Sequence, residues 1–200
     1  MSKSILNLLV LLMMVLMNNS VFSQTMIGPR VSYLSSGFIG FDESSPAMPS
    51  RFNGLQVGGY IKSPLDENLN IESTLTYNMS GVNAIPMGVN TQEEYRFHSF
   101  DATLTLSRNI KKMAIELGPV LRSLAYVEQK SVSKLNATTG WKSITLGYLL
   151  GVKYDMTRIR LGLSYQASFG DVVQVEEQLN PGSMKYNQIT FSIELKAPTN

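Results

Sequence analysis

Hydrophobic and polar residues alternate with a period of two along most of the chain. Within 69–79, apolar residues such as Leu69 and Ile71 stand at odd positions and polar residues such as Asn70 at even ones. Successive side chains of a β-strand point to opposite faces, so this period predicts strands rather than helices. We predict an all-β protein whose strands cover 25–34, 54–62, 69–79, 95–107, 113–126, 141–154, 158–169 and 185–196.

The predicted connections are alternately long and short. The long ones are 35–53, 80–94, 127–140 and 170–184, and the short ones are 63–68, 108–112 and 155–157. Transmembrane barrels sort their connections in this way, with short turns on the periplasmic side and long loops outside. In hydrocarbon, only helices and closed barrels satisfy every backbone N–H and C=O group. We therefore predict an eight-stranded antiparallel transmembrane up-and-down β-barrel.

Two features favour an apolar face that points outward to lipid. Aromatic residues stand toward the strand ends of that face, as interfacial girdles do: Tyr33, Tyr77, Phe100, Tyr148, Tyr154, Tyr165 and Phe169. Glycines gather on the polar face, as suits the narrow interior of a small barrel: Gly28, Gly58, Gly118, Gly147, Gly151 and Gly162. The alternative is a soluble periplasmic lipid-binding barrel, which would bury the apolar face and expose the polar one.

In a membrane barrel the polar face is the lumen, and its charges must pair because unpaired buried charges are costly. The predicted lumen network comprises Arg30, Glu72, Asp101, Glu116, Arg122, Lys153, Arg160 and Glu194. Lys62 and Arg158 share this face at strand ends, where we expect water to reach them. We expect Glu116 or Glu72 to be the partner of Arg122, and we expect a polar plug without a continuous pore.

The first residues differ from the rest of the chain. Lys3 precedes the apolar run 5–17, which is interrupted only by Asn7, and Val21 to Ser23 resemble a cleavage site before Gln24. This is the order of a secretory signal peptide, and the run is too short to span a bilayer as a helix. We predict a signal peptide at 1–23, a barrel domain at 24–200, and a protein exported to the outer membrane.

Composition excludes several kinds of chemistry. The net charge of +2 is too small for a nucleic-acid-binding surface, and the absence of cysteine excludes disulfides, thiolate metal sites and a cysteine nucleophile. With a single histidine, His98, we predict no metal site and no cofactor. No hydrolase or phosphate-binding motif is present, so we predict no enzyme activity. The enzymatic alternative is an outer-membrane lipid A-modifying enzyme that uses an outward-facing His98 close to Ser123.

Four segments of the second half carry a family resemblance: 117–125 (LGPVLRSLA), 146–154 (LGYLLGVKY), 160–170 (RLGLSYQASFG) and 186–195 (YNQITFSIEL). They resemble the PorT-like group of small outer-membrane β-barrel proteins, whose fold is similar to the OmpA/OmpX type. The resemblance covers 112–196 well and 24–111 loosely. It implies a small outer-membrane barrel, and PorT itself is an accessory of a protein-secretion system.

The predicted function is therefore non-enzymatic and lies in the outer loops, because loops carry function on a rigid scaffold. We expect a structural, adhesive or envelope-assembly and secretion-accessory role. The candidate interaction surface is formed by Phe38, Phe41, Asp42, Glu43, Phe52, Glu176 and Glu177. The expected partners are outer-membrane lipid and another envelope or secretion protein, with the barrel itself a monomer that binds no nucleic acid.

Overall fold

The computed structural model describes residues 25–39, 50–84, 93–130, 142–172 and 185–196. The strands are β1 (Met26–Ile39), β2 (Ser50–Pro64), β3 (Leu69–Ala84), β4 (Glu93–Ile110), β5 (Met113–Lys130), β6 (Ile144–Asp155), β7 (Ile159–Ser168) and β8 (Lys185–Leu195). Each strand pairs antiparallel with the next, and β8 pairs with β1 to close the barrel. The predicted eight-stranded antiparallel barrel is therefore confirmed.

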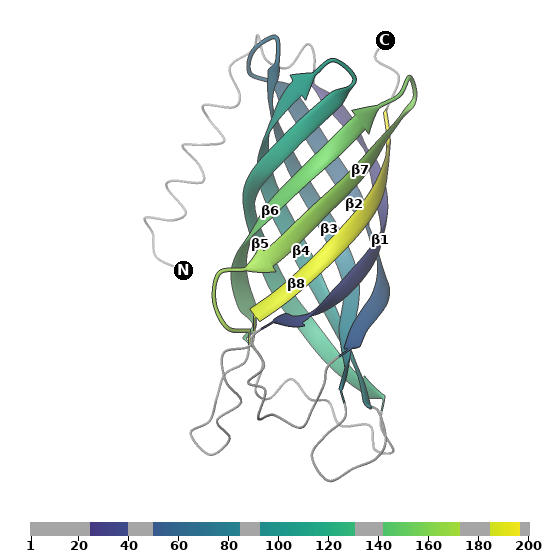
Figure 1. The fold of residues 1–200 in the computed structure, drawn as a ribbon, viewed down its shortest axis with the longest axis vertical. Coiled ribbons are helices and arrows are strands. Elements are labelled where there is room, and N and C mark those ends of the chain that lie inside the picture. The colour runs from purple at the N-terminus through teal and green to yellow at the C-terminus, as the bar shows by residue number, and fades with distance from the viewer. Residues whose placement is uncertain (1–24, 40–49, 85–92, 131–141, 173–184, 197–200) are drawn as a thin grey trace.

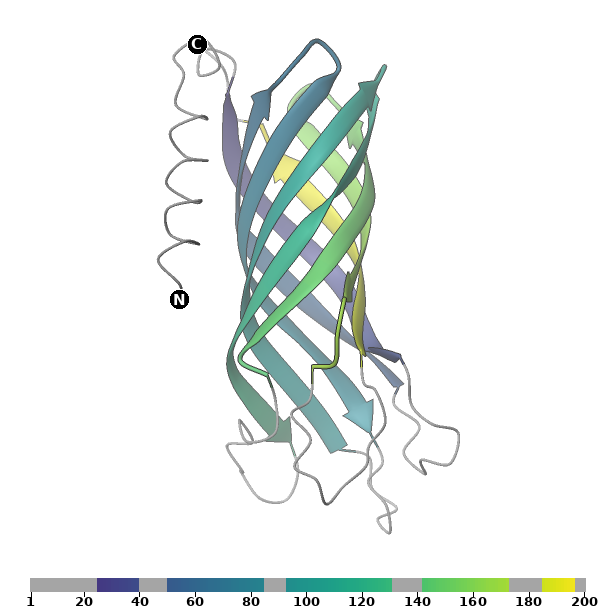
Figure 2. The ribbon, with the colours of Figure 1, turned by 90° about the vertical axis from the view of Figure 1, so that its left-hand side faces the viewer.

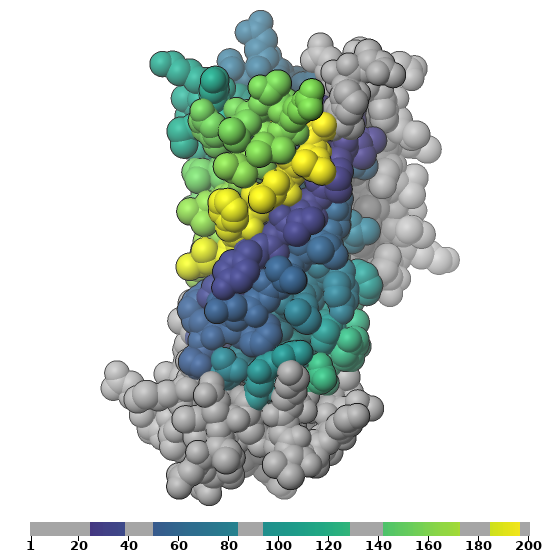
Figure 3. Space-filling model, turned by 90° about the vertical axis from the view of Figure 1, so that its right-hand side faces the viewer, coloured from purple at the N-terminus to yellow at the C-terminus, as the bar shows by residue number. Residues whose placement is uncertain are grey.

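Closure leaves no free sheet edge, because the first and last strands pair over most of their length. Their register runs from Arg30 opposite Glu194 to Ile39 opposite Lys185. All strands are tilted strongly against the long axis of the barrel (Figures 1 and 2). On one side of the molecule β8, β1 and β2 cross the surface as adjacent diagonal bands (Figure 3). Every backbone group in the paired region can thus find a partner.

The two ends of the barrel differ in their connections. The turns at 65–68, 111–112 and 156–158 join the strands at one end, which we call the turn end (Figure 1). The longer connections 40–49, 85–92, 131–143 and 169–184 join the strands at the opposite end, which we call the loop end. Within the described residues, no helix has the length and hydropathy needed to cross a membrane.

Several strands continue farther toward the loop end than the sequence pattern predicts. Residues 35–39 belong to β1 and 50–53 to β2, although we expected both segments to be loop. Ser36 is buried inside the barrel, where its hydroxyl donates to the carbonyl of Gly81 at 2.9 Å and accepts from the Gly81 amide at 3.0 Å. Because the interior of the barrel is polar, a small polar residue such as Ser36 can point inward, and the strand extends beyond its predicted end.

The distribution of side chains is the reverse of that in a water-soluble barrel. Large apolar side chains cover the outside, where Leu75 is 63 % and Leu117 is 57 % exposed. Charged side chains fill the inside, where Asp101 is 0 % and Glu72 is 1 % exposed. In β6 the same alternation places Gly147, Leu149, Gly151 and Lys153 inward. The polar face is therefore the lumen.

Candidate functional site

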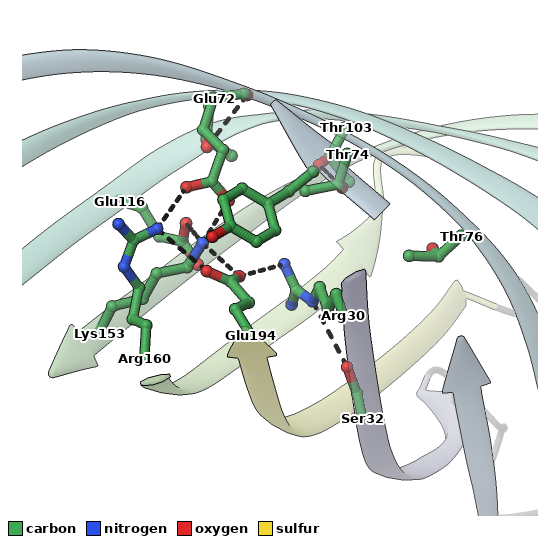
Figure 4. Close-up of polar contacts among 12 residues, drawn as sticks. Arg30, Ser32, Glu72, Thr74, Thr76, Thr103, Glu116, Lys153, Arg160 and Glu194 are labelled. Atoms are coloured by element: carbon green, nitrogen blue, oxygen red, sulfur yellow. Dashed lines mark hydrogen bonds and ion pairs between the residues drawn. The ribbon is translucent and has the colours of Figure 1, made fainter. Parts of the chain in front are cut away.

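Six charged side chains from six strands meet inside the turn-end half of the barrel (Figure 4). This six-residue cluster consists of Arg30, Glu72, Glu116, Lys153, Arg160 and Glu194. Its three cations and three carboxylates balance, and all six side chains are almost completely buried. Because buried charges are tolerated only when they are paired and hydrogen-bonded, this balance is a condition for folding.

Lys153 of β6 lies at the centre of the six-residue cluster. Its ammonium lies 3.0 Å from Glu116 Oε2 and 2.8 Å from Glu194 Oε1, and it also donates to Glu72 Oε1. These three carboxylates come from β5, β8 and β3. Gly151 leaves the space that this packing needs, because a Cβ atom there would lie 2.7 Å from Glu116 Oε1. One lysine therefore holds together strands from different sides of the barrel.

Arg160 of β7 links two of the same carboxylates a second time. Its Nη1 donates to Glu72 Oε2 at 3.1 Å and to Glu194 Oε2 at 3.0 Å. Its Nε donates to Asp155 Oδ1 at 3.0 Å. Arg30 of β1 completes the group with an ion pair to Glu194 at 3.3 Å. Because the three cations balance the three carboxylates, loss of any single cation leaves an unbalanced negative charge in the closed interior.

A second charged group lies nearer the loop end and is built around one bidentate pair. Arg122 of β5 donates from Nε to Asp101 Oδ1 at 2.9 Å and from Nη2 to Asp101 Oδ2 at 2.6 Å. Asn78 and Ser99 also donate to the Asp101 carboxylate, at 3.0 and 3.1 Å. The Arg122 guanidinium stacks on the ring of Tyr186, 3.9 Å from its centroid. Parallel N–H···O pairs of this kind are strong and directional.

The structure places all eight residues of the predicted lumen network inside the barrel, but divided between these two groups. The expected pairing of Arg122 with Glu116 or Glu72 is wrong, because its partner is Asp101, directly opposite in the β4–β5 register. Glu116 and Glu72 contact Lys153 instead. Alternation along the strands identified the face, whereas the pairing depends on register and on reach across the lumen.

Two cations at strand ends, Arg158 and Lys62, were expected to be in contact with water, but they differ in exposure. Arg158 is exposed in the turn between β6 and β7. Lys62 is buried near the end of β2, opposite Met26 on one side and Glu72 on the other. The expectation for Lys62 is therefore wrong, because β2 continues to Pro64 and keeps Lys62 inside the paired region.

The candidate interaction surface is only partly within the described residues. Phe38 and Phe52 were expected on a loop, but they lie in β1 and β2. Phe52 is buried, and the Phe38 ring packs against Phe97 and Tyr186 inside the barrel, so this part of the prediction is wrong. The other members, Phe41, Asp42, Glu43, Glu176 and Glu177, lie outside the described residues.

The His98–Ser123 pair is not formed as expected. The turn at 111–112 is shorter than predicted, so the β4–β5 register places His98 opposite Tyr126 and Ser123 opposite Phe100. His98 stacks on Tyr126 at 4.1 Å between ring centroids and hydrogen-bonds the Tyr77 hydroxyl through Nδ1. Its Nε2 lies 3.9 Å from a Glu128 oxygen. His98 is thus the centre of an aromatic cluster rather than the base of a Ser–His pair.

Sequence reasoning did not identify the uncharged residues that complete the interior. Tyr60 points inward from β2, and its hydroxyl donates to the Leu195 carbonyl at 3.0 Å. Gln188 accepts from Asn78 at 3.2 Å and from the Tyr186 hydroxyl at 2.6 Å. The sequence signal for these residues was the alternation of odd and even positions, because each of them stands on the polar face of its strand. Within the described residues, no three His, Asp or Glu side chains are grouped so that they could hold a metal ion.

No known protein-family model matches the sequence. No curated protein matches it either. Among solved structures, the chain is similar to Neisserial surface protein A, with a TM-score of 0.54 and 14 % identity over 86 % of this chain and 97 % of that one. Ail, the attachment invasion locus protein of Yersinia pestis, has a TM-score of 0.49 and 10 % identity over 86 % of this chain and 98 % of Ail. The fold of this chain is that of small eight-stranded outer-membrane β-barrels.

Proposed function

We propose that this protein is a non-enzymatic outer-membrane barrel that acts as a closed scaffold and presents an interaction surface at its loop end. The observation that carries the proposal is the reversed distribution of side chains. Apolar residues such as Leu75 and Leu117 are exposed around the outside, whereas Asp101 and Glu72 are buried within. Exposing such a belt to water would cost about 25 cal/mol per Å² of apolar surface, and lipid removes this cost.

The packed interior supports a role other than transport through the lumen. The six-residue cluster and the Asp101–Arg122 pair occupy the lumen at two levels, and side chains just fill the interior of an eight-stranded barrel. With the lumen filled, the loop end remains as the surface for interactions. A structural, adhesive or envelope-assembly role fits such a surface. The PorT-like resemblance favours the last of these, as an accessory of protein secretion. The signal peptide proposed for export, 1–23, lies outside the described residues.

The two alternatives have less support. A soluble lipid-binding barrel would need an apolar interior, whereas this lumen contains charged pairs. A lipid A-modifying enzyme built on His98 and Ser123 would need these two side chains together, and the register separates them. The partners that fit the proposal are outer-membrane lipid around the barrel and an envelope or secretion protein at the loop end, with the barrel itself monomeric.

Fractionation and topology mapping test this proposal. The protein should sediment with outer membranes and resist extraction by carbonate, as integral barrels do. Short epitope tags at Ser45 or Asn136 should be labelled on intact cells, whereas tags at Asp66 or Lys112, in the turns, should be labelled only after lysis. Recovery in the soluble periplasmic fraction, or the reverse labelling pattern, would contradict the proposal.

The accessory role needs a separate experiment. A deletion strain should secrete less of the cargo proteins of its secretion system, and the intact protein should restore secretion. A variant with the 170–184 connection replaced by a short Gly-Ser linker should insert normally and fail to restore it. Unchanged secretion in the deletion strain, together with normal insertion, would contradict the accessory role and leave the barrel assignment intact.

A further inference from the structure

Three exposed cations gather on the β4–β5 hairpin at the turn end of the barrel, and we call them the basic turn: Arg108, Lys111 and Lys112. The strands on either side, β3 and β6, and the turns that end them lie within the described residues. Main-chain hydrogen bonds hold the hairpin on both sides. The Asn109 amide donates to the Asn68 carbonyl at 2.7 Å, and the Asp155 amide donates to the Lys112 carbonyl at 2.7 Å. The basic turn is therefore a fixed group of positive charges.

The carboxylates of the neighbouring turns do not neutralise the basic turn. Asp155, at the end of β6, is engaged by Arg160 at 3.0 Å and by Lys196 at 2.6 Å. Asp66 and Glu67 lie in the turn between β2 and β3. Among the described residues, no carboxylate forms an ion pair with any cation of the basic turn. Its positive charge is thus available to a ligand.

The backbone at Lys111 does not explain why a lysine stands there. Ile110 pairs with Met113, which leaves a two-residue hairpin turn. Lys111 adopts a φ of 58°, a conformation for which such turns favour glycine, asparagine or aspartate. The geometry of the turn therefore favours a smaller, uncharged or acidic residue, and the lysine side chain points to a use outside the fold.

Arg108 places the basic turn at the boundary of the bilayer. It lies opposite Leu69 on one side and Ile115 on the other, and both of these apolar side chains are exposed on the outer surface. Arg108 stands two residues before Ile110, which is about 7 Å along the strand from the turn. A long arginine side chain at this depth extends back to the membrane interface, where lipid phosphates lie. A soluble ligand would not require a cation among lipid-facing side chains.

The charge of the basic turn selects among lipid headgroups. The phosphate of a phosphatidylcholine or phosphatidylethanolamine is balanced by its own ammonium group, whereas phosphatidylglycerol carries a net negative charge. A basic residue near an anionic membrane surface favours anionic lipid by about fivefold. Arginine and lysine also donate charge-assisted hydrogen bonds to phosphate oxygens. The three cations therefore favour an anionic phospholipid over a zwitterionic one.

We propose that the basic turn is a binding site for the headgroup of an anionic phospholipid, such as phosphatidylglycerol, in the membrane leaflet at the turn end. Arg108 donates to the phosphate from within the apolar belt, and Lys111 and Lys112 contact the headgroup from the turn. The acyl chains lie along the outer surface of β4 and β5. This inference rests on the proposed membrane insertion and adds a lipid preference at one end of the barrel.

Quenching of a local tryptophan by brominated lipids tests the proposal. The chain has one tryptophan, so the full-length mature protein with Trp141→Phe and Ile110→Trp reports only from the hairpin. It is reconstituted into phosphatidylcholine nanodiscs that contain increasing fractions of brominated phosphatidylglycerol or brominated phosphatidylcholine. Half-maximal quenching should occur at a mole fraction of phosphatidylglycerol at least about tenfold lower than that of phosphatidylcholine.

Four substitutions in this reporter protein locate the site. Arg108→Gln and Lys111→Asn should each lower the preference for phosphatidylglycerol about fivefold. Asparagine suits the positive φ at position 111, so the loss in Lys111→Asn cannot come from a damaged turn. Lys111→Arg keeps the charge and should retain the preference. Lys185→Gln removes an exposed lysine at the loop end and should leave the preference unchanged.

The other outcomes overturn the proposal. An equal loss in Lys185→Gln and Arg108→Gln would mean that only the net charge of the protein matters. A full preference in the double variant Arg108→Gln, Lys111→Asn would place the lipid elsewhere. Equal quenching by the two lipids, with an emission shift on addition of poly-glutamate, would assign the basic turn to an acidic protein segment. Because the assay uses barrels already inserted, these results leave insertion to the fractionation experiment.

Discussion

At the scale of single residues, the interior is organised by charge balance rather than by apolar packing. Lys153 contacts three carboxylates, and Arg122 contacts one through two parallel hydrogen bonds. Replacing a buried ion pair by neutral residues often costs little, whereas removing one partner strands the other charge. The stability of this barrel should therefore depend on which charges are removed together.

The first prediction concerns the bidentate pair at the loop-end level. Arg122→Gln and Asp101→Asn should each lower the free energy of unfolding by about 3–5 kcal/mol, and the double variant should lose less than the sum. The measurement is a double-mutant cycle on urea unfolding in liposomes. The control cycle combines Arg122→Gln with Glu116→Gln, whose effects should add within about 0.5 kcal/mol. Coupling in the control cycle and none in the first would contradict the Arg122–Asp101 pairing.

The second prediction concerns the centre of the six-residue cluster. Lys153→Met should lower the free energy of unfolding by about 3–5 kcal/mol, because Glu72, Glu116 and Glu194 lose a shared cation. Lys112→Met, at an exposed turn position, should change it by less than about 0.5 kcal/mol. The same urea titration measures both variants. Similar small losses for the two would mean that the Lys153 ammonium is hydrated.

At the scale of strands and turns, small differences in length decide which residues meet. The β4–β5 turn consists of 111–112, where Lys111 adopts a φ of 58°. A longer turn at 108–112 would place His98 near Leu121 and Ser123, as the alternation alone predicts. The shorter turn, with a register shift between His98 and Ser99, brings His98 to Tyr126 instead. The hydrophobic pattern does not contain this information, because turn conformation depends on local backbone geometry.

The third prediction concerns how deeply outward residues lie in the bilayer. Leu121 stands near the middle of β5, and Ile110 stands at the turn end of β4, and both are outward and about half exposed. Leu121→Arg should cost about 2–4 kcal/mol and Ile110→Arg about 0–1 kcal/mol, since the cost of a charge falls from midplane to interface. Unfolding in liposomes measures both. Equal costs at the two depths would argue against membrane insertion.

At the scale of the whole molecule, the closure of the barrel explains why side chains fill its interior. Pairing of β8 with β1 removes the sheet edge, and the narrow ring that results has room only for side chains. The charged residues inside therefore contact one another across the lumen rather than line an aqueous channel. The exception is a small hollow at the loop end, which is lined by apolar residues such as Phe38 and Phe97 together with Arg122.

The fourth prediction follows from the filled lumen. The purified protein should show no steady ion conductance in planar bilayers, because the two charged groups leave no continuous aqueous path. A wide porin inserted into the same bilayers provides the positive control. Stable ohmic steps that scale with protein concentration would show that the lumen is open, and the scaffold role would then need revision.

The sequence by itself determined the fold class, the number of strands and the face on which the charged residues of the predicted strands stand. These features are local, because the side-chain period of two is set by strand geometry at each residue. The alternation of odd and even positions correctly placed Asp101 and Arg122 in the lumen, and Leu75 and Leu117 on the outside. It could not place the strand ends. Ser36, for example, is a residue type typical of loops, and it extends a strand here because the interior of the barrel is polar.

Only the tertiary structure decided which charges pair and which aromatic residues meet at the loop end. Lys153 reaches Glu72 from β6 to β3, and no spacing along the chain links these two positions. Arg122 meets Asp101 because a two-residue turn sets the β4–β5 register. The small hollow at the loop end is lined by Phe38, Phe97 and Tyr186, which come from three strands. Contacts across a closed barrel depend on turn lengths, register and side-chain reach together, and alternation along one strand specifies none of these.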